Sequence, residues 1–413
     1  MKADVLVLGA GIVGVSIALH LQARGRKVAL IDRKPPGRET SYGNAGLIER
    51  SSVIPYPFPR DLSLLLPYAF NRRTEVRYHL RQLLRVARWL AHYWRDSSPR
   101  RVAAIAAQML PLIERSVLEH DALADASGAH RYFRRTGWIE CMRDEKSFQR
   151  AIAEAENLAP YGLRHRVLDA EALHKEEPSL GRVLAGAIHW QDPVTVSDPG
   201  AVTQAYANLY RDRGGEFLFG DAATLSQDGS AWSVRTDGGA IHAPDAVIAL
   251  GPWSCGLLRP LGYRIPLAVK RGYHRHFSLS DGAVLEHPVV DVEHGYVLSP
   301  MVQGVRLTTG VEFAHRDASP TPVQLERATA MARQLLPLGP PVESDPWMGS
   351  RPCLPDMRPV IGPAARHAGL WMAFGHCHHG FTLGPVTGRL MADLMTGTDP
   401  GFDATPFLPA RFD

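Results

Sequence analysis

The sequence VLVLGAGIVG at residues 5–14, followed by KVALID at residues 27–32, decides the fold. Residues 5–8 are apolar without alternation, which is typical of a strand buried on both faces of a parallel sheet. The pattern G-x-G-x-x-G follows directly, and residues 12–24 then have helical spacing. The second strand ends in the acid Asp32. Strand, glycine turn, helix and strand in this order predict a βαβ unit that binds a dinucleotide.

Each part of this βαβ unit has a physical role. Gly9 permits the tight turn, Gly11 lets a pyrophosphate approach the backbone, and Gly14 lets helix and strand pack closely. The helix N-terminus offers unpaired N–H groups to phosphates, and Asp32 can accept hydrogen bonds from a ribose. The predicted cofactor contacts in this unit are Gly9, Ala10, Gly11, Ile12, Val13, Gly14, Asp32 and Arg33. The motif alone does not separate FAD from NAD, and a purely structural βαβ turn is the alternative interpretation.

Composition places the chain among ordinary globular proteins. Its 413 residues include 46 lysines and arginines against 42 aspartates and glutamates, a net charge of +4, and 45% are hydrophobic. These values exclude a disordered, collagenous or disulfide-rich protein, and the charge is too small to indicate nucleic acid as a partner. The four cysteines are scattered, no apolar run approaches ~20 residues, and the N-terminus lacks the pattern of a signal peptide. We therefore expect a reduced, cytoplasmic protein.

The remaining sequence alternates between two kinds of pattern. Segments of α/β type lie at residues 1–50, 195–260 and 350–400, whereas residues 61–125 are helical by pattern and residues 266–313 alternate like an antiparallel sheet. Residues 131–142 predict a hairpin, and residues 146–158 a helix. We predict an α/β plus antiparallel-β fold with two interleaved domains. The nucleotide-binding domain would comprise residues 1–56, 151–262 and 346–413, and a substrate domain with a helical insertion would comprise residues 57–150 and 263–345.

Three further segments make a family resemblance specific. They are TSYGNAG at residues 40–46, VIALGPWS at residues 247–254, and the C-terminal pair WMGSRPCLPDMRPVIG at 347–362 and AFGHCHHGFTLGPVTGRL at 373–390. With the N-terminal motif, they resemble the D-amino-acid oxidase superfamily of FAD-dependent amine oxidoreductases. The chain looks most like the small-subunit group of D-amino-acid dehydrogenases. It is also similar to glyphosate oxidoreductase-like enzymes through RGYH at 271–274, GYVLSP at 295–300 and TGVEFA at 309–314.

The resemblance implies a Rossmann-type, glutathione-reductase-like FAD domain and an antiparallel substrate domain. Residues 375–384 form a glycine-rich loop that opens a helix, whose N–H groups can stabilise negative charge on a reduced flavin. A simple left-handed turn before a helix is the alternative for this loop. The predicted cofactor contacts therefore extend to Ser41, Asn44, Ala45, Gly46, Leu47, Ala249, Gly251, Trp253, Arg351, His379, Gly380 and Thr382. We expect noncovalent FAD, because Gly349 stands where cysteine-linked sarcosine oxidases place their cysteine, four residues before Cys353.

Candidate substrate residues follow from the chemistry of amino-acid oxidation. A carboxylate must be held, and the fork of an arginine pairs with two oxygens; Arg351 stands where the family places such a residue, with an ion pair to Asp356 as the alternative. Tyr296 matches a family tyrosine that meets the substrate, although such a tyrosine is as often core. His379 can set the protonation of the substrate. The predicted catalytic residues are His379, Tyr296 and Arg351, and the predicted substrate contacts are Arg351, Tyr296, Tyr273, His274 and Glu312. Glu312 can equally pair with Arg306 on the sheet surface.

The cluster His376, Cys377, His378 and His379 invites a metal interpretation. The spacing H-C-H-H does not place ligands on one face at the separations that zinc requires, and no second ligand pair lies nearby in the sequence. We therefore predict no metal site in this chain.

A strongly basic block lies between Arg60 and Arg101, with ten arginines against three acidic residues, a net charge of +7 in 42 residues. Leu80, Leu83, Leu84, Ala87, Leu90, Ala91 and Trp94 follow helical spacing, with Arg77, Arg81, Arg85, Arg88, His92 and Arg95 opposite and Tyr78, Trp89 and Tyr93 at the border. The apolar stripe predicts a helix packed on the substrate domain. The alternative is a membrane-surface helix over residues 77–95.

Together these observations predict FAD-dependent oxidative deamination of D-amino acids or related small amino or imino acids. Hydride passes from Cα to flavin N5, and the resulting imine hydrolyses to a 2-oxo acid. Cleavage of secondary amines of the N-substituted glycine or D-proline type is an alternative, and a non-catalytic dinucleotide-binding redox sensor is an alternative of another class. The implied partners are the substrate and a respiratory quinone or other electron acceptor. The implied location is the cytoplasm, with the inner face of the cytoplasmic membrane as an alternative.

Overall fold

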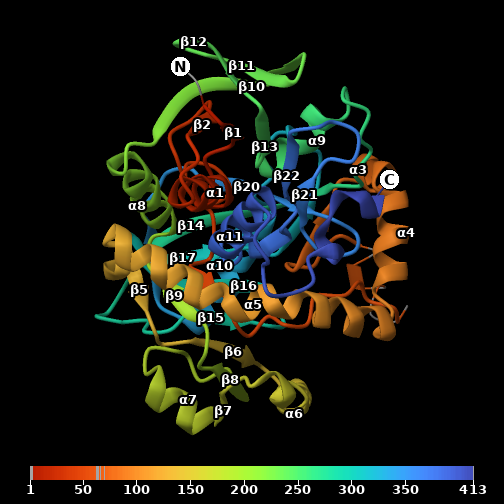
Figure 1. Cartoon of the computed structure of the whole chain (residues 1–413). Helices are drawn as coiled ribbons and strands as arrows, with labels where there is room; N and C mark the ends of the chain where they lie inside the picture. The colour runs from red at the N-terminus through yellow and green to blue at the C-terminus, as the bar shows by residue number, and fades with distance from the viewer. Residues whose placement is uncertain (1–2, 62–64, 66, 69, 413) are drawn as a thin grey trace.

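The computed structural model describes residues 3–61, 65, 67–68 and 70–412, which build two large sheets (Figure 1). The first sheet has eight strands and contains the N-terminal βαβ unit. Its order is β12 (Gly239–Ala243), β11 (Ala231–Thr236), β10 (Glu216–Asp228), β2 (Val28–Asp32), β1 (Val5–Leu8), β13 (Asp245–Ile248), β22 (Leu370–Phe374) and β21 (Val360–Pro363). The five strands from β10 to β22 are parallel. The predicted Rossmann-like α/β arrangement is therefore present.

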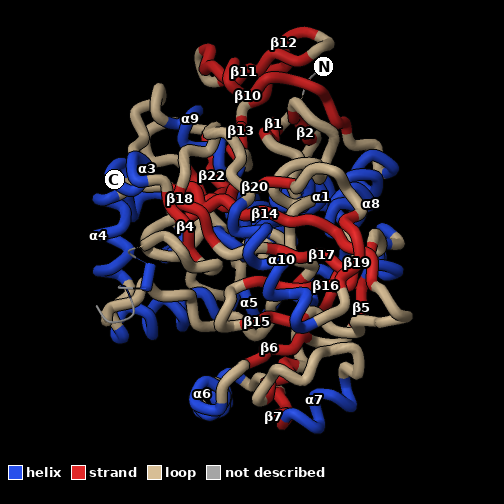
Figure 2. Tube along the Cα trace, turned by 180° about the vertical axis from the view of Figure 1, so that it is seen from behind, coloured by secondary structure: helices blue, strands red, loops and turns tan. Residues whose placement is uncertain are grey.

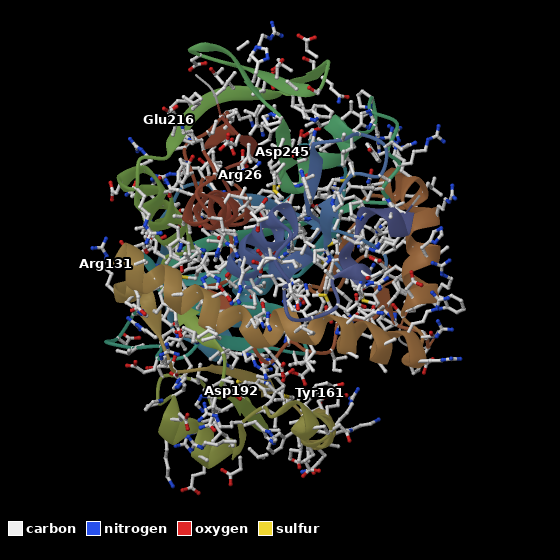
Figure 3. All side chains as sticks on the ribbon, viewed as in Figure 1. Arg26, Arg131, Tyr161, Asp192, Glu216 and Asp245 are labelled. Carbon is white, nitrogen blue, oxygen red and sulfur yellow. The ribbon has the colours of Figure 1, made fainter. Side chains whose placement is uncertain are left out.

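Helices cover one face of this parallel sheet. They are α1 (Ile12–Ala23), α8 (Pro199–Asp212) and α11 (Gly384–Thr396), whose apolar sides form one core with Val5, Val7 and Leu30. Asp198 caps α8 by accepting a 2.9 Å hydrogen bond from the Ala201 N–H. The other face packs against the β10–β12 meander and the short helix α9 (Ser254–Leu258). The pair Arg26–Asp245, 2.9 Å apart, ties the chain before β2 to the start of β13 (Figure 3).

The second sheet is mostly antiparallel and lies beside the first, as the rear view shows (Figure 2). Its order is β4 (Val76–Tyr78), β18 (Val311–Phe313), β14 (Ala268–Leu279), β17 (Gly304–Thr308), β16 (Tyr296–Met301), β15 (Val289–Asp291), β6 (Trp138–Met142), β8 (Gly186–Trp190) and β7 (His165–Asp169). Strands β19 (Leu338–Pro341) and β20 (Trp347–Cys353) pair with β14. Helix α10 (Val323–Leu335) contributes to the core of this sheet, so the antiparallel prediction for residues 266–313 is confirmed.

Two sequence-based boundaries need correction. Residues 131–142 are not a hairpin: β5 (Phe133–Arg134) pairs with β9 (Val194–Val196) in a small third sheet with β3 (Leu47–Ile48), whereas β6 pairs with β8 and β15. The chain turns between the two sheets at Gly137, whose φ is +71° and whose Cβ would lie 2.0 Å from the Trp190 carbonyl oxygen. Strands β7 and β8 also belong to the second sheet, although the predicted nucleotide-binding segment 151–262 contains them. Helix α6 (Glu145–Glu156) matches the helix predicted at 146–158.

The basic block forms β4 and the helices α3 (Leu80–Arg85), α4 (Ala87–Asp96) and α5 (Pro99–Ser127), with five residues of the predicted helical stretch 61–125 outside the described residues. The apolar side chains predicted to be buried on these helices are mostly not the buried ones. Trp89 and Tyr93 are buried beside Phe313, whereas Leu80, Leu84 and Trp94 are 68%, 73% and 45% exposed. Aromatic area drives this burial, and the break at Val86 changes the helix direction. In the described part of the chain, no helix combines the length and hydropathy that a bilayer span requires.

Candidate active site

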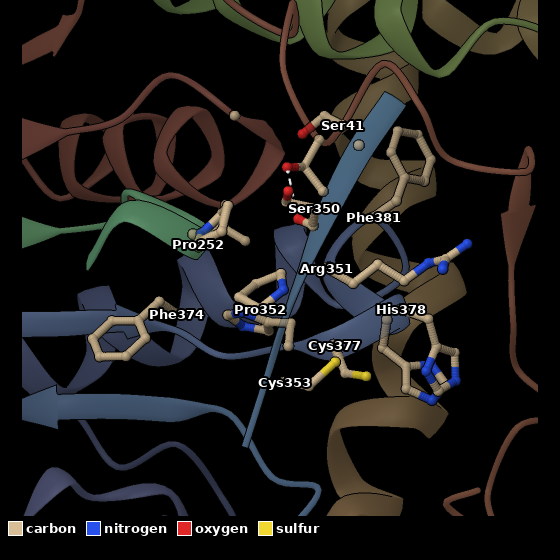
Figure 4. A pocket seen from close by; sticks show the side chains of 18 of the residues that line it. Ser41, Pro252, Ser350, Arg351, Pro352, Cys353, Phe374, Cys377, His378 and Phe381 are labelled. Atoms are coloured by element: carbon tan, nitrogen blue, oxygen red, sulfur yellow. Dashed lines mark hydrogen bonds between the residues drawn. The ribbon is translucent and has the colours of Figure 1, made fainter. Parts of the chain in front are cut away.

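A cavity of about 830 Å³ runs from the β1–α1 turn to strands β14 and β20 of the second sheet. Its walls include Gly9, Asp32 and Trp253 at one end and Arg351 and His379 at the other. Figure 4 shows Arg351 above His378 near the second end, with Cys377 and Cys353 to the left of His378. A cavity that joins a dinucleotide motif to a cationic end can hold both a cofactor and a carboxylate substrate.

The glycine turn is built from close backbone contacts. Gly9 has a φ of +108°, and a Cβ there would lie 2.5 Å from the Ala249 carbonyl oxygen. A Cβ on Gly14 would lie 1.8 Å from the Gly9 carbonyl oxygen, so α1 begins directly against the strand end. A Cβ on Gly11 would lie 3.2 Å from the Ser41 hydroxyl oxygen. A side chain on Gly9, Gly11 or Gly14 would therefore occupy the space in which a phosphate can approach the start of α1.

Asp32 and Ser41 fix the shape of this turn. The Asp32 carboxylate accepts hydrogen bonds from the N–H groups of Ala10 at 2.7 Å and Lys34 at 3.0 Å. The Ser41 hydroxyl accepts a 2.9 Å hydrogen bond from the Ile12 N–H at the start of α1. Asp32 also lines the cavity, as the predicted contact with a ribose requires. The residues present at this end fit an adenine dinucleotide such as FAD.

Most of the predicted cofactor residues line the cavity, and four do not. The lining residues are Gly9, Gly11, Ile12, Val13, Asp32, Arg33, Ser41, Asn44, Ala45, Leu47, Ala249, Gly251, Trp253, Arg351, His379 and Gly380. Ala10, Gly14, Gly46 and Thr382 lie behind this wall. The buried Thr382 hydroxyl accepts from the Glu49 N–H at 3.1 Å and donates to the Leu47 carbonyl at 3.3 Å, so its contact is with the chain itself.

Arg351 is a half-buried cation without an acidic partner among the described residues. Its guanidinium donates only to backbone carbonyls, to Gly310 at 2.8 Å, to Thr309 at 3.1 Å and to Arg271 at 3.5 Å. Gly272 makes room for it, because a Cβ there would lie 2.7 Å from Nη1 of Arg351. Burial lowers the pKa of Arg351 below its ordinary value. The guanidinium therefore retains capacity for a carboxylate from outside the chain.

The alternative partner proposed for Arg351 is engaged elsewhere. Asp356 pairs with Arg358 at 3.0 Å and with Arg411 at 2.8 Å. An ion pair between Arg351 and Asp356 is therefore absent from the structure.

Tyr296 does not meet the cavity, so its predicted contact with substrate is wrong. Its ring is buried in the core of the second sheet beside Asp291 and Arg143, and burial raises the pKa of its hydroxyl. Its neighbour Val297 lines the cavity instead. Successive side chains of a strand point to opposite faces, so the motif was assigned one residue out of phase.

Tyr273 and Glu312 form part of a buried structural network. Glu312 is fully buried and pairs with Arg271, with 2.6 Å between Oε2 and Nη2. The Tyr273 hydroxyl donates to Glu312 at 2.7 Å and accepts from the Thr321 N–H at 2.9 Å. Burial alone would raise the pKa of Glu312, but hydrogen bonds from Thr321, Tyr273 and Arg271 hold that pKa below its ordinary value. Glu312 therefore lies outside the cavity as a partner of Arg271, and Tyr273 contributes to the wall with its hydroxyl already bonded.

His274 and Arg306 also make structural contacts within the protein. The His274 ring stacks on Trp347 with centroids 4.8 Å apart, and burial lowers its pKa to about 2. It does not line the cavity, so the predicted substrate contact is wrong. Arg306 donates to the carbonyls of Tyr42 at 2.9 Å and Asn44 at 2.6 Å, which excludes the suggested pair with Glu312.

The histidine cluster meets the cavity through His376, Cys377, His378 and His379. His379 is buried, its Nδ1 has no hydrogen-bond partner, and burial lowers its pKa well below the ordinary value. His376 bonds to the Thr387 hydroxyl at 2.9 Å, and burial lowers its pKa to about 3. Ligand atoms of His378 and His379 lie within 4.8 Å of a Glu49 oxygen, a proximity that the local H-C-H-H spacing could not predict.

Lys270 is a cavity residue that the sequence analysis missed. Its ammonium lies 4.4 Å from the Tyr93 ring centroid and 5.4 Å from that of Trp89. Burial favours its neutral form, yet the Tyr93 hydroxyl and the sulfurs of Cys353 and Cys377 raise its pKa. A hydrogen bond from Cys353 in turn lowers the pKa of Cys377 well below the ordinary thiol value. The alternation of side chains along β14 could have indicated Lys270. Residues 270 and 272 face the cavity, while Arg271 is buried with Glu312.

Comparison with known proteins identifies the family. The profile described as FAD dependent oxidoreductase, DAO, matches residues 4–394. The chain belongs to this family. This chain is 31% identical over 409 residues to a D-amino acid dehydrogenase of Chromohalobacter salexigens, and the alignment covers 97% of each chain. It is 29% identical over 435 residues to a D-amino-acid oxidase of Bradyrhizobium diazoefficiens, covering 99% of this chain and 98% of the relative.

Solved structures share the DAO fold over the full chain. Glycine oxidase from Geobacillus kaustophilus superposes with a TM-score of 0.75 at 22% identity, covering 99% of both chains. Iminodiacetate oxidase from Chelativorans sp. BNC1 superposes with a TM-score of 0.70 at 20% identity, covering 98% of this chain and 99% of the other. Membership of the DAO family and the fit of the glycine turn establish FAD as the cofactor.

Gly14→Ala is expected to reduce FAD binding severely. The new methyl group would meet the Gly9 carbonyl oxygen at 1.8 Å, so α1 must move away from the phosphate site. The ratio of flavin to protein absorbance in the purified variant measures the loss. Gly238→Ala is the matched control, because a Cβ there meets only the Thr236 hydroxyl at 3.8 Å. Equal flavin content in wild type and Gly14→Ala would contradict the assigned role.

Proposed function

We propose that this enzyme oxidises the C–N bond of a small α-amino or α-imino acid, with D-amino acids as the leading class. The observation that carries the proposal is the guanidinium of Arg351, which faces the cavity and, among the described residues, bonds to carbonyl oxygens and to no acid. A substrate carboxylate that covers this cation supplies the counter-charge in bidentate geometry. The names of the two curated relatives, D-amino acid dehydrogenase and D-amino-acid oxidase, support the D-amino-acid class.

The residues that line the cavity have different proposed roles in the reaction. Arg351 orients the carboxylate, and the neutral ring of His379 contributes to the cavity wall at the same end. FAD, when bound, accepts the hydride that leaves Cα. The substrate loses that hydride and one amine proton, and water then converts the imine to a 2-oxo acid and ammonia. The apolar residues Val297 and Leu47 in the wall help to keep bulk water from the reacting carbon.

The domain roles belong to the same proposal. The eight-stranded sheet with the glycine turn would form the glutathione-reductase-like FAD domain, and the 11-stranded sheet would form the substrate domain. Strands β14 and β20 of the second sheet contribute Lys270 and Arg351 to the cavity, which supports this division.

Anaerobic bleaching of the flavin band tests the proposed reaction. The purified enzyme is mixed with D-amino acids, their L-enantiomers and N-substituted glycines, and the loss of absorbance near the flavin maximum is recorded. We expect bleaching by at least one small D-amino or imino acid, and a D-amino acid with a primary amine should give a 2-oxo acid and ammonia. Bleaching only by N-substituted glycines would favour secondary-amine cleavage, and no bleaching by any panel member would contradict the proposal. Reoxidation by oxygen or by a soluble quinone then identifies the class of acceptor.

We expect the FAD to be bound noncovalently. Gly349, not a cysteine, occupies the position of the family's cysteine linkage, and a Cβ there would already meet the Trp347 ring at 2.1 Å. Acid denaturation should release all yellow colour into the supernatant. Colour that stays with the precipitated protein would contradict this prediction, and the variant Cys353→Ala would then test that sulfur as the attachment point.

A second proposal concerns the surface formed by α3 and α4, and it places the enzyme on an anionic membrane. Leu80, Leu84 and Trp94 are exposed there among Arg81, Arg85 and Arg88, and the Arg60 guanidinium lies 3.9 Å from the Trp94 ring centroid. Exposed residues recur at 80, 81, 84, 85, 87, 88, 91, 94 and 95, which is helical spacing. Apolar groups flanked by arginines on one helical face match an acyl boundary beneath anionic headgroups. The proposed location is therefore the cytoplasmic face of the membrane.

Vesicle flotation tests this membrane surface. We expect the enzyme to float with anionic vesicles at low salt, and the triple variant Arg81→Glu, Arg85→Glu, Arg88→Glu to remain at the bottom of the gradient. Each basic residue contributes about 1 kcal/mol near such a surface, so the binding constant should fall at least a hundredfold. The matched control replaces the exposed Arg211, Arg213 and Arg235 by Glu and should float like wild type. Unchanged flotation of the first variant would contradict the proposal.

A further inference from the structure

A cluster of two histidines and a glutamate lies in the lobe formed by β6, β7, β8, α6 and α7 (Ala170–Glu176), at the bottom of Figure 1. Glu176 ends α7, His189 lies on β8, and His287 comes from the loop before β15. One ligand atom of each residue lies within 4.8 Å of the other two. None of the three lines the cavity described above, so the cluster is a separate site.

Hydrogen bonds on the far side of each imidazole determine which nitrogen faces the cluster. Nε2 of His189 lies 2.8 Å from the Thr136 carbonyl oxygen, and since a carbonyl only accepts, Nε2 carries the proton. Nδ1 of His287 lies 2.8 Å from Oε1 of Glu177, so it donates to that carboxylate. The neutral rings therefore present lone pairs at Nδ1 of His189 and Nε2 of His287. Both nitrogens are turned toward Glu176, at 2.7 Å and 3.9 Å from its Oε1.

One ring nitrogen of this cluster has no partner. Nδ1 of His189 is buried and has no hydrogen-bond partner, although a carboxylate oxygen lies 2.7 Å away. A lone pair and a carboxylate repel each other unless a cation lies between them. Arg166 lies on the outer side of the carboxylate, with its Nη1 2.9 Å from Oε2 and 3.3 Å from Oε1 of Glu176, and does not contact either imidazole.

We propose that Glu176, His189 and His287 bind a divalent metal ion of the zinc class. Two imidazoles and one carboxylate form a donor set that suits Zn²⁺ and its neighbours, and a tetrahedral ion with bonds of about 2.0–2.2 Å needs ligand atoms roughly 3.3 Å apart. The observed separations bracket that value, and water completes the coordination. Glu177 is fully buried and also accepts the backbone N–H of His287 at 2.7 Å. It therefore has the place of the outer carboxylate that orients a metal-binding histidine.

The three ligands come from segments that are distant in the sequence, so a bound ion would hold these segments together. Helix α7, strand β8 and the loop before β15 would be linked by one ion. The metal would therefore stabilise the lobe at the β7 end of the second sheet. The sequence pattern predicts no metal here, because Glu176, His189 and His287 are not neighbours in the chain, whereas the histidines at 376–379 are.

The test uses the flavin-loaded enzyme freed of metal with EDTA and titrated with Zn²⁺ alone by calorimetry. We expect one high-affinity equivalent, an increase in melting temperature, and with Co²⁺ a visible difference spectrum typical of tetrahedral coordination. His287→Gln should abolish this equivalent. Glu177→Gln, which keeps all three ligands, should weaken it by about 10- to 100-fold.

Two control variants make the result decisive. His165→Gln changes a histidine of the same lobe that packs on Trp190 and lies outside the donor set, and it should bind Zn²⁺ like wild type. His378→Gln removes a ligand of the other cluster, beside Glu49. Loss of the equivalent in His378→Gln but not in His287→Gln would overturn the proposal. If the wild-type enzyme does not bind Zn²⁺, the proposal is also overturned. Nδ1 of His189 would then carry a proton that it donates to Glu176.

Discussion

Arg351→Met is expected to reduce kcat/KM for amino-acid substrates by about 30- to 4,000-fold. The loss of a buried hydrogen-bonded charge partner costs about 2 to 5 kcal/mol, and every 1.4 kcal/mol is about tenfold. The effect should appear mainly as a higher KM, because the substrate carboxylate loses the guanidinium proposed to hold it. Steady-state kinetics with the best substrate of the bleaching panel measures it.

Two further variants separate carboxylate binding from general damage. Arg351→Lys keeps the charge but loses the planar fork, so it should recover only part of the activity. Arg259→Met removes an exposed arginine and should leave KM unchanged. All variants should retain flavin and melt near the wild-type temperature. An unchanged KM in Arg351→Met would exclude the assigned role, even if other substrates of the enzyme were found.

Glu312→Ala is expected to lower the free energy of unfolding by about 3 to 5 kcal/mol, although Glu312 does not contact the substrate. The change leaves the guanidinium of Arg271 fully buried without its carboxylate. Denaturant unfolding followed by tryptophan fluorescence measures the loss. Glu154→Ala, at an exposed position of α6, is the control and should have little effect. The double variant Arg271→Met, Glu312→Leu removes both charges and should recover most of the stability, because a buried ion pair can be replaced by apolar groups at little cost.

The stabilisation by Glu312 depends on pH in a defined direction. Hydrogen bonds hold the pKa of Glu312 below its ordinary value in the folded protein. The stabilisation is therefore fully present above the ordinary carboxyl pKa of about 4.3 and is lost as the pH falls through the lower folded value. The stability difference between wild type and Glu312→Gln should narrow below that pH. A difference that is constant from pH 7 to pH 3 would contradict this account.

Side-chain direction was the main feature of the site that the sequence left open. Tyr296 and Val297 are neighbours in one motif, yet only Val297 faces the cavity. Along β14 the cavity receives Lys270 and Gly272, while Arg271 is buried with Glu312. Both faces of this sheet are covered, so apolar and polar residues occur on each of them and alternation alone does not tell which face meets the ligand. A one-residue error in phase then moves every predicted contact to the wrong side.

The basic block shows the same limit for helices. Spacing predicted helices there, but not that Trp89 and Tyr93 would be buried while Leu80 and Leu84 remain exposed. The aromatic rings find Phe313 and the ammonium of Lys270, which come from strands about 200 residues further along the chain. Partners so distant in sequence leave no signal in the local pattern.

Local backbone requirements are what the sequence determined by itself. Gly9 needs a positive φ, Gly14 must lie against a carbonyl, and Asp32 must end a strand, so residues 5–32 could form one βαβ unit and one dinucleotide site. The tertiary structure alone decided which charges meet. It left Arg351 without an acid, joined Glu312 to Arg271, and gathered Glu176, His189 and His287 at one point. Charge pairing depends on distances across the fold, which residue type and spacing along the chain do not contain.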